Sequence, residues 1–373
     1  MKKLKLLVLL FLVGCGGSNK VETHTNPVSN PIASVAERSF QRAVSQAFQD
    51  RSLPAVAAGL WQPGREPVLV LLGKSDLKTG RLPSSGDKFR IGSVTKSFTV
   101  TVLLQLVDEG RVTLDDPIGD FVPNIHNPEA TLEELANMTS GVFNYTENPD
   151  FTNEFIQDLQ RVWTEQELIQ AAIEKPPYFA PGEGWHYSNT NTVALGLVVE
   201  QVTGNSLAQE IESRITLPLG MLGTSYPASA EMPVPFAVGY GLFEPQGELV
   251  DLTLSDPSAS AGSGALVSCL RDLHIWGRAL GRGQLLSESS REKQLQFVST
   301  DGCPDCPEYD AYGLGIGRLD GWQGHTGDYI GYQALVMYNP QTEQVAVILV
   351  NLKDFTDSAH VPTAIFRNFV AGS

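Results

Sequence analysis

The chain has 373 residues, of which 42% are hydrophobic and 18% are charged, and its formal net charge is −16. A chain of this length can bury a sizeable core, in one large domain or in two intimately packed ones. Its acidic balance argues against nucleic acid or an anionic lipid surface as a partner. We find no internal repeat, and no second apolar run long enough to cross a membrane.

The N-terminus is typical of a secretion signal. Residues 1–5 are basic, and the apolar core at 6–13 is too short to span a bilayer. The core ends in Leu-Val-Gly-Cys, which resembles the bacterial lipobox, so we expect a lipoprotein signal peptide over 1–14 and lipid on Cys15. An ordinary signal peptide that contains a cysteine is the alternative. Residues 15–33 lack apolar periodicity and predict a flexible tether. The expected location is the cell envelope, on the outer membrane or the cell surface.

The elements predicted from residue 34 onward place strands at both ends of the chain and helices between them. Apolar spacing and capping boxes predict helices over 35–52, from Ser93 through 98–107, over 132–138, after Thr164, and over 190–202, 207–215 and 359–369. Strand patterns occupy 55–61, 68–72, 332–338 and 344–351.

We therefore expect an α/β (α+β) domain over 34–371. Strands from both termini would form one sheet, with a sheet subdomain at about 34–90 and 310–371. A mostly helical subdomain at about 91–309 would pack beside it, and a ligand would bind in the cleft between the two.

A Ser-x-x-Lys pattern is the first pointer to chemistry, although it occurs four times, beginning at Ser75, Ser85, Ser93 and Ser290. Ser75 and Ser85 flank a turn-rich run, and Ser290 lies in a polar, exposed helix start. Only Ser93 follows a strand-like segment and opens a long apolar helix, where the Lys96 amine would share its face. Such an amine can take the serine proton, and the N–H groups of a helix start suit an oxyanion. A helix N-cap is the other role open to Ser93.

Two further short motifs supply partners for this pair. Tyr187 is the one tyrosine with an asparagine two residues on, Asn189, which offers a phenol for proton transfer and an amide for a substrate carbonyl. A tyrosine in a capping loop is the alternative. The run His325-Thr326-Gly327 opens a strand-like segment that could face Ser93, whereas Lys78-Thr79-Gly80 lies in a surface turn.

Together these motifs resemble the family of secreted serine DD-peptidases and class C β-lactamases, most closely the Streptomyces-type D-alanyl-D-alanine carboxypeptidases. The resemblance runs from about residue 35 to the C-terminus. It is carried by FRIGSVTKSF at 89–98, LVDEGRVTLDDP at 106–117, TSGV at 139–142, PG at 181–182, YSNTN at 187–191, YGLG at 312–315 and GHTG at 324–327. It implies a five-stranded antiparallel sheet flanked by helices, with an α-helical domain.

The resemblance also implies roles for single residues. Ser93 would attack a carbonyl carbon, Lys96 would take its proton, and Tyr187 would relay a proton to the leaving group. Asn189 would hold the substrate amide, and His325, Thr326 and Gly327 would bind its carboxylate side. The oxyanion would rest on the backbone N–H groups of Ser93 and Asp328.

The expected function is that of a serine D-alanyl-D-alanine carboxypeptidase without a cofactor. Because His325 is a weaker carboxylate anchor than lysine and Asp328 adds a negative charge, an esterase or a class C-like β-lactamase of the same fold stays open. A penicillin-binding lipoprotein without turnover is a further alternative. The partners would be a small peptide, β-lactam or ester substrate and, through the lipid, a membrane; we expect a monomer.

Other hydrolase types fit the sequence less well. An α/β-hydrolase would need Gly-x-Ser-x-Gly, which does not occur, and six scattered histidines make a triad through His325 a weaker hypothesis. No His/Asp/Glu cluster has metal-ligand spacing. Cys303 and Cys306 could form a redox motif or half a metal site, but an oxidising compartment favours a disulfide, with Cys269 free and buried.

Overall fold

The structure, a computed structural model, describes residues 33–303 and 306–373. The predicted signal peptide, Cys15 and the tether up to residue 32 lie outside the described residues. Within the described ranges, no helix has both the length and the apolar character needed to cross a membrane. Ser34–Ser373 form one unit by the pattern of their contacts.

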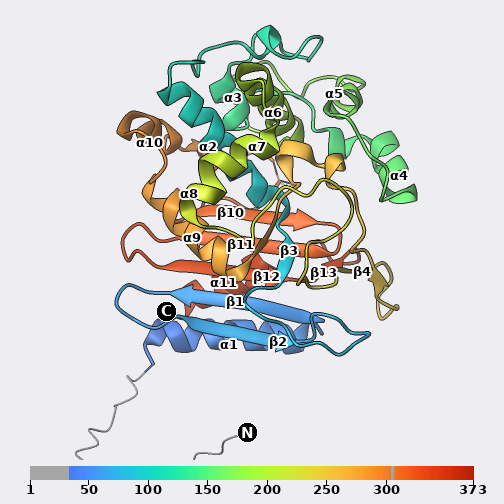
Figure 1. Cartoon of the computed structure of the whole chain (residues 1–373), viewed down its shortest axis with the longest axis vertical. Coiled ribbons are helices and arrows are strands. Elements are labelled where there is room, and N and C mark those ends of the chain that lie inside the picture. The colour runs from blue at the N-terminus through green and yellow to red at the C-terminus, as the bar shows by residue number, and fades with distance from the viewer. Residues whose placement is uncertain (1–32, 304–305) are drawn as a thin grey trace, which may run out of the picture. The chain divides into compact units, whose positions relative to one another are not determined.

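The largest sheet of this unit has eight antiparallel strands (Figure 1), in the order β2-β1-β12-β11-β10-β9-β8-β7. Its strands are β1 (Ala55–Trp61), β2 (Val68–Gly73), β7 (Val298–Ser299), β8 (Ala311–Tyr312), β9 (Gly317–Leu319), β10 (Trp322–Tyr329), β11 (Tyr332–Tyr338) and β12 (Val345–Val350). Val56 of β1 pairs with Val350 of β12, which confirms that both termini build one sheet. The five long strands agree with the expected sheet, and β7, β8 and β9 extend one edge.

Along the sequence, most of the helices come between the N-terminal strands and the C-terminal strands. They are α1 (Val35–Asp50), α2 (Thr95–Asp108), α3 (Leu132–Ala136), α4 (Pro149–Gln157), α5 (Glu165–Ile173), α6 (Asn189–Thr203), α7 (Leu207–Ile211), α8 (Leu217–Leu219), α9 (Leu270–Arg282), α10 (Glu288–Gln294) and α11 (Val361–Ala371). The remaining strands are short: β3 (Lys88–Arg90), β4 (Tyr240–Leu242), β5 (Val250–Asp251), β6 (Val267–Cys269) and β13 (Leu352–Asp354).

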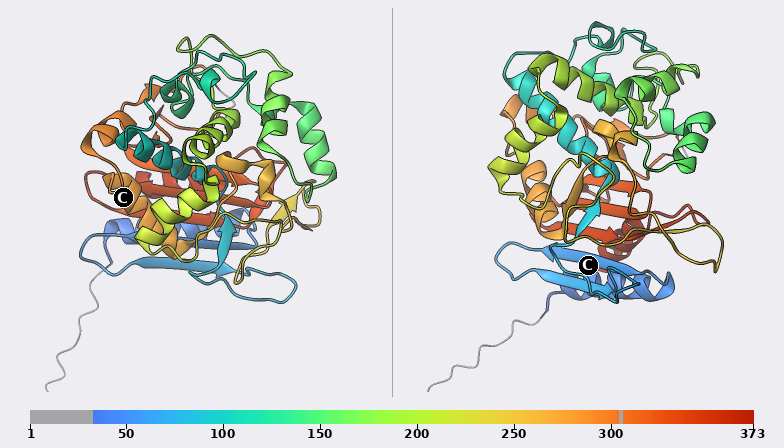
Figure 2. Two further views of the ribbon diagram at one scale, coloured as in Figure 1. Left: turned by 45° about the horizontal axis from the view of Figure 1, so that its top comes forward. Right: turned by 45° about the vertical axis from the view of Figure 1, so that its right-hand side comes forward.

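The sheet is buried on both faces because its strands carry apolar side chains in both directions. Helices α1 and α11 cover one face, where Phe366 and Phe369 pack with Ile348 of β12. On the other face α9 lies against β11 and β12, and the cluster there includes Val347 and Trp276. Figure 2 shows α2 and the other helices of the middle part beyond α9, away from α1. Two hydrophobic clusters therefore hold the sheet between two helical layers.

The local signals in the sequence agree with the structure at several points, but helices α4 and α9 were not predicted and three other points differ. The capping boxes at Thr131 and Thr164 are present, and Lys78 lies in an exposed turn. The helix predicted over 207–215 instead leaves α-geometry after Ile211, in a π-helical turn over Glu212–Thr216. The predicted exposure of Ser290 is wrong, because this side chain is buried and donates to Asp108 Oδ1 at 2.5 Å. Strands β7 to β9 were not predicted, since two or three residues show no periodicity.

Candidate active site

The side chains of Ser93 and Lys96 meet at the start of α2. A 3₁₀ turn over Gly92–Val94 leads directly into the helix, so the two side chains lie on one face. Lys96 Nζ lies 3.0 Å from Ser93 Oγ. The apolar helix buries the lysine completely, which holds its amine against the serine hydroxyl.

The other contacts of Lys96 fix the direction of its lone pair. Its Nζ lies 2.6 Å from Asn189 Oδ1 and 2.9 Å from the carbonyl oxygen of Ser263. These two oxygens can only accept hydrogen bonds, so a neutral amine gives them its two protons. The lone pair is then left for the proton of the Ser93 hydroxyl, which is the arrangement that a general base needs.

Burial decides the protonation of this amine. Desolvation holds the pKa of Lys96 well below its usual value of 10.5, because the charged form loses its hydration in the core. The described partners of Nζ are the neutral oxygens of Ser93, Asn189 and Ser263, and no carboxylate is among them. The lowered pKa of Lys96 therefore favours the neutral amine, which is the form that a general base needs.

Tyr187 lies in the loop before α6, with its ring centre 4.8 Å from Lys96 Nζ. Its hydroxyl is buried, and the Ser93 hydroxyl is the side-chain group that interacts with it. Burial raises the pKa of Tyr187 well above 10, so the phenol keeps its proton at neutral pH. The lowered pKa of Lys96 favours an amine with a free lone pair, whereas the raised pKa of Tyr187 favours a phenol that keeps its proton. The lysine is therefore the better base and the tyrosine the better proton donor.

Asn189 begins α6 and connects the pair to the helical part. Its Oδ1 accepts from Lys96, its Nδ2 donates to Thr146 Oγ1 at 3.0 Å, and its backbone N–H donates to Asn144 Oδ1 at 3.0 Å. The side chain is thus oriented by partners on both ends. It also lines a cavity beside Ser93, where a substrate amide would come within its reach.

Strand β10 approaches the start of α2 backbone to backbone. A Cβ on Gly327 would lie 1.9 Å from the carbonyl oxygen of Ile91 and 3.2 Å from the Ser93 nitrogen. A Cβ on Gly92, whose φ is +49°, would lie 2.9 Å from the Asp328 nitrogen. Glycine is required at both positions, and the close approach brings the N–H groups of Ser93 and Asp328 to one place. Two backbone N–H groups in such proximity are the kind of donors that an oxyanion hole uses.

Gly327→Ala is expected to reduce kcat by about 10²–10³-fold, because the new methyl group would push β10 away from Ser93 and separate the two N–H donors. Steady-state kinetics would measure the loss. Gly86→Ala is a matched control, since a Cβ there meets nothing within 4 Å and the backbone of Gly86 lies outside the left-handed region. Retention of wild-type kcat in Gly327→Ala would show that the two N–H groups do not bind the oxyanion.

His325 lies elsewhere than the sequence led us to expect. It is completely buried, with Nδ1 2.5 Å from the carbonyl oxygen of Thr326 and Nε2 2.7 Å from Tyr312 Oη. A carbonyl only accepts, so Nδ1 carries the proton and Nε2 accepts from the tyrosine. Burial lowers the pKa of His325 to about 3. A neutral, fully occupied imidazole gives a substrate carboxylate no charge, so direct binding by His325 does not fit this placement.

Two cavities open beside Ser93. The first, of about 290 Å³, has an apolar wall that includes Tyr145, Phe155, Ile156 and Tyr329. The second, of about 360 Å³, is lined by Tyr187, Thr326, Gly327, Asp328 and the C-terminal segment around His360. Ser93 thus lies between an apolar and a polar cavity. Thr326 and Gly327 line the polar cavity, and their predicted binding of a substrate stays a prediction.

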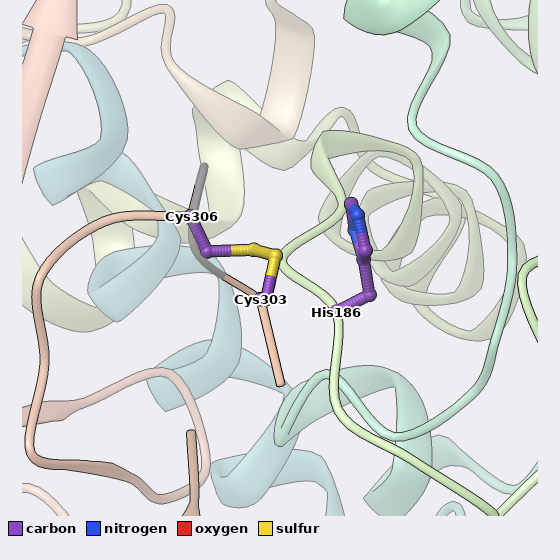
Figure 3. A group of neighbouring side chains, drawn as sticks. All are labelled: His186, Cys303 and Cys306. Atoms are coloured by element: carbon purple, nitrogen blue, oxygen red, sulfur yellow. A yellow bond between two sulfur atoms is a disulfide. The ribbon is translucent and has the colours of Figure 1, made fainter. Parts of the chain in front are cut away.

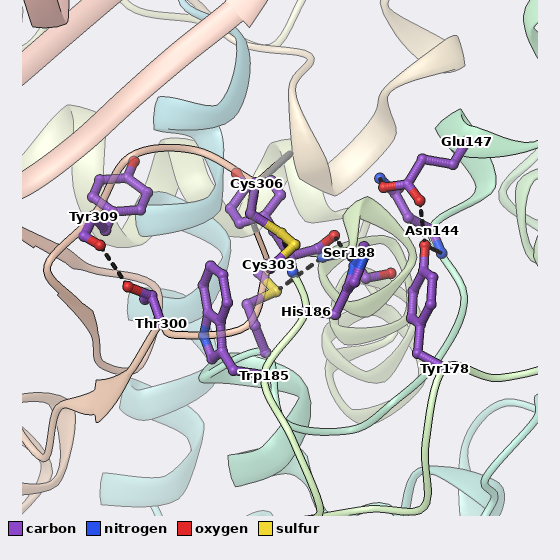
Figure 4. The surroundings of a disulfide bond; sticks show 12 residues. Asn144, Glu147, Tyr178, Trp185, His186, Ser188, Thr300, Cys303, Cys306 and Tyr309 are labelled. Atoms are coloured by element: carbon purple, nitrogen blue, oxygen red, sulfur yellow. Dashed lines mark hydrogen bonds between the residues drawn. A yellow bond between two sulfur atoms is a disulfide. The ribbon is translucent and has the colours of Figure 1, made fainter.

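A disulfide forms part of the polar wall. Cys303 and Cys306 are bonded to each other and Cys269 is free and buried, as predicted. Cys306 Sγ accepts the backbone N–H of Tyr187 at 3.3 Å and lines the cavity. Figure 4 shows Trp185, His186 and Ser188 gathered around the bond. The loop therefore supports the segment that carries Tyr187.

His186 stands beside the two sulfurs (Figure 3), and the three ligand atoms lie within 4.8 Å of one another. Metal ligation by cysteine needs thiolates, and these sulfurs are bonded to each other. We therefore describe this group as a structural wall of the site.

Sequence patterns missed three contributors to the site. Tyr309 Oη accepts the backbone N–H of Thr326 at 2.8 Å and so fixes β10 beside Ser93. The Ser263 carbonyl accepts from Lys96, and His360 Nε2 lies 3.0 Å from the carbonyl oxygen of Gly327. None of these has a local motif. Only the fold brings them to the serine.

Comparison with known proteins places this geometry in a family. A family model described as Beta-lactamase matches residues 40–367. Penicillin-binding protein 4* of Bacillus subtilis is 26% identical, over 76% of this chain and 64% of its own length. Protein flp of Staphylococcus aureus is 25% identical, over 88% of this chain and 65% of its own length. The chain thus spans slightly less than two thirds of the length of these curated relatives.

Solved structures of the same fold agree with this family. A D-stereospecific amidohydrolase from Streptomyces sp. is 30% identical with a TM-score of 0.77, covering 91% of this chain and 98% of that one. A penicillin-binding protein from Bacillus halodurans is 25% identical with a TM-score of 0.74, covering 87% and 98%. A D-amino acid amidase from Ochrobactrum anthropi, at 24% identity and a TM-score of 0.79, covering 91% and 98%, shares the fold. The chain belongs to the beta-lactamase family, the serine hydrolases that include the penicillin-binding proteins.

Proposed function

We propose that the protein is a serine amidohydrolase that cleaves small amides or short peptides through an acyl-enzyme on Ser93, without requiring a carboxylate on the leaving group. Lys96 takes the serine proton, Tyr187 passes a proton to the leaving amine, and the N–H groups of Ser93 and Asp328 bind the oxyanion. Hydrolysis of the acyl-enzyme by water then releases the acid and frees the serine.

The charge of the polar cavity is the observation that carries this proposal. Its described lining contains Glu308 and Asp328 and includes neither lysine nor arginine. Lys353, at the edge of the apolar cavity, is paired with Asp328 at 2.5 Å, and Arg367 is paired with Glu308. A carboxylate entering beside Thr326 would meet no unpaired cation there. An uncharged or amine-bearing leaving group avoids that cost.

The apolar cavity suggests what the acyl side carries. Its lining includes Phe155 and Ile156 of α4 together with Tyr145, Tyr329 and Asn189. Burying a large apolar side chain there would contribute about 1.5–3 kcal/mol. We therefore propose a bulky apolar or aromatic side chain on the acyl residue. The Streptomyces neighbour, a D-stereospecific amidohydrolase, supports D-configuration as the first case to test.

A D-alanyl-D-alanine carboxypeptidase is the second candidate. The motifs around Ser93, Tyr187 and Thr326 and the penicillin-binding relatives favour it. It would need a cation for the terminal carboxylate, and in the described site such a cation becomes free only if Lys353 leaves Asp328 or Arg367 leaves Glu308. An esterase, a β-lactamase or a penicillin-binding protein without turnover would use the same serine.

A substrate panel separates these functions: D-phenylalanine amide, L-phenylalanine amide, a peptide ending in D-Ala-D-Ala, a penicillin and a p-nitrophenyl ester. We expect D-phenylalanine amide to have a kcat/KM at least about tenfold above that of the D-Ala-D-Ala peptide, because the peptide buries an unpaired carboxylate. Efficient release of D-alanine with little amide cleavage would establish the carboxypeptidase instead. Turnover of the ester alone would indicate an esterase, and a stable penicillin adduct without turnover would indicate a binding protein.

We further propose that the protein is secreted, anchored by lipid on Cys15 to the cell envelope, and monomeric. The lipobox-like sequence supports the anchor. Membrane fractionation of cells that express the Cys15→Ser variant tests it, since the variant should be recovered in the soluble fraction. One solved neighbour with 23% identity is described as octameric, so the mass in solution needs its own measurement.

A further inference from the structure

His360 is a histidine that the serine chemistry described above does not use. It is the N-cap of α11 and lines the polar cavity. The backbone N–H of Thr363 lies 3.3 Å from its Nδ1, and Thr363 Oγ1 lies 2.8 Å from the same atom. A backbone N–H can only donate, so Nδ1 is the unprotonated nitrogen. The proton must therefore sit on Nε2.

That proton points to the backbone of the oxyanion hole. His360 Nε2 lies 3.0 Å from the carbonyl oxygen of Gly327, which can only accept, so the imidazole donates to it. The carbonyl of Gly327 and the N–H of Asp328 belong to one planar peptide group. In a trans peptide they point in opposite directions. The histidine thus holds one end of the peptide group whose other end faces Ser93.

The close contact with Gly92 shows which way this peptide is turned. A Cβ on Gly92 would lie 2.9 Å from the Asp328 nitrogen and 2.5 Å from its oxygen, so both atoms face the start of α2. A hydrogen bond accepted by a peptide carbonyl makes the N–H of the same peptide a stronger donor. It also resists rotation of the peptide plane. Both effects act on the Asp328 N–H when negative charge develops on the substrate oxygen.

We propose that His360, as its neutral Nε2–H tautomer, is a positioning residue that orients and polarises the Gly327–Asp328 peptide of the oxyanion hole. The α11 cap selects this tautomer, because it occupies Nδ1 with donors from Thr363. A side chain that holds a catalytic backbone group in this way improves transition-state binding through that group. The inference rests on the acyl-enzyme chemistry proposed for Ser93, but not on the identity of the substrate.

Two substitutions separate the two ring nitrogens. The Oδ1 of asparagine takes the place of Nδ1, so His360→Asn keeps the helix cap and removes the donor to Gly327. Glutamine is long enough to place an N–H near the Nε2 position, so His360→Gln keeps the donor and weakens the cap. We expect His360→Asn to lower kcat about tenfold with KM changed less than about twofold, and His360→Gln to keep more of kcat. His126→Asn is a matched control away from the site.

The infrared carbonyl band of the acyl-enzyme reports on the oxyanion hole itself. The band would not shift if His360 only stabilised the fold. We expect this band to shift to higher wavenumber in His360→Asn, because a weaker oxyanion hole polarises the ester carbonyl less, and to stay near the wild-type position in His360→Gln. Kinetics and spectra use the p-nitrophenyl ester or whichever panel member acylates the wild-type protein.

An unshifted carbonyl band with a folded His360→Asn protein would overturn the inference, as would a rate ranking in which His360→Asn exceeds His360→Gln. If His360→Asn does not fold, the His360→Gln result decides: a wild-type band supports the role of the donor, and a shifted band contradicts it. Failure of the wild-type protein to cleave any amide would overturn the proposed function and leave this test intact with the ester.

Discussion

Ser93→Ala is expected to lose hydrolysis of every substrate by a factor on the order of 10⁴–10⁶, because no other described hydroxyl lies against the Lys96 amine. The variant should fold normally, since the hydroxyl of Ser93 hydrogen bonds within the site and the backbone turn over Gly92–Val94 stays the same. Initial rates on the panel, with circular dichroism of both proteins, provide the measurement.

The chain contains its own control for this experiment. Ser85 and Lys88 share the Ser-x-x-Lys spacing, but Lys88 Nζ donates to the carbonyl oxygen of Val234 at the surface. Ser85→Ala should keep wild-type rates. Equal loss in both variants, or residual turnover near the wild-type rate in Ser93→Ala, would contradict the assignment of the nucleophile.

Lys96→Met is expected to lower kcat by about 10²–10⁴-fold, because it removes the general base and leaves an apolar side chain of similar length. The acid limb of the wild-type rate profile should follow protonation of the amine, so activity should fall as the pH drops through the lowered pKa of Lys96. A pH–rate profile from pH 5 to 10 tests both statements, and Lys88→Met is the surface control. A rate in Lys96→Met within a few-fold of the wild-type rate would refute the role of base.

The same amine should make stability depend on pH. In the unfolded chain Lys96 binds a proton up to about pH 10.4, whereas the folded protein holds it neutral from its lowered pKa upward. Between these two values the unfolded state binds one proton more, so the free energy of unfolding rises with pH by up to about 1.4 kcal/mol per unit. The free energy of unfolding is measured by urea at pH 8 and 9 for the wild-type protein and for Lys96→Met. The difference between the two proteins should show this slope. A difference that does not change with pH would mean that the buried amine is charged.

The sequence predicted many of the elements that carry a local periodic signal, although it missed the amphipathic helix α9. The long strands β1, β2, β11 and β12 and the helices α1, α2 and α6 have runs of apolar residues, and their bounds agree to within a few residues. The Ser93–Lys96 pair was predictable for a similar reason. Three residues along a helix fix the relative position of two side chains before any tertiary contact forms.

The orientation of His325 could not be predicted, because β10 is covered on both faces. A His-Thr-Gly run on a strand half exposed to solvent would have placed alternate residues inside and outside. Here Tyr309 and Tyr312, from the short strand β8 and the loop before it, supply a buried hydroxyl environment that takes up the imidazole. That environment depends on a fold in which distant segments meet.

His360 and the Ser263 carbonyl were missed for a related reason. The histidine acts through a backbone carbonyl 33 residues away, and Ser263 contributes a main-chain oxygen that any residue would supply. Backbone groups have no sequence signature. Glycine at Gly92 and Gly327 was the nearest available signal, since close backbone approach is one of the few reasons for requiring it.

Trapping of the covalent intermediate tests the central claim most directly. Turnover of the p-nitrophenyl ester is quenched with acid during the first turnover, and the adduct is located by peptide mass spectrometry. The account predicts one acyl group per chain, on the peptide that contains Ser93, and no adduct in Ser93→Ala. Product formation without an adduct, or an acyl group on another residue, would contradict it.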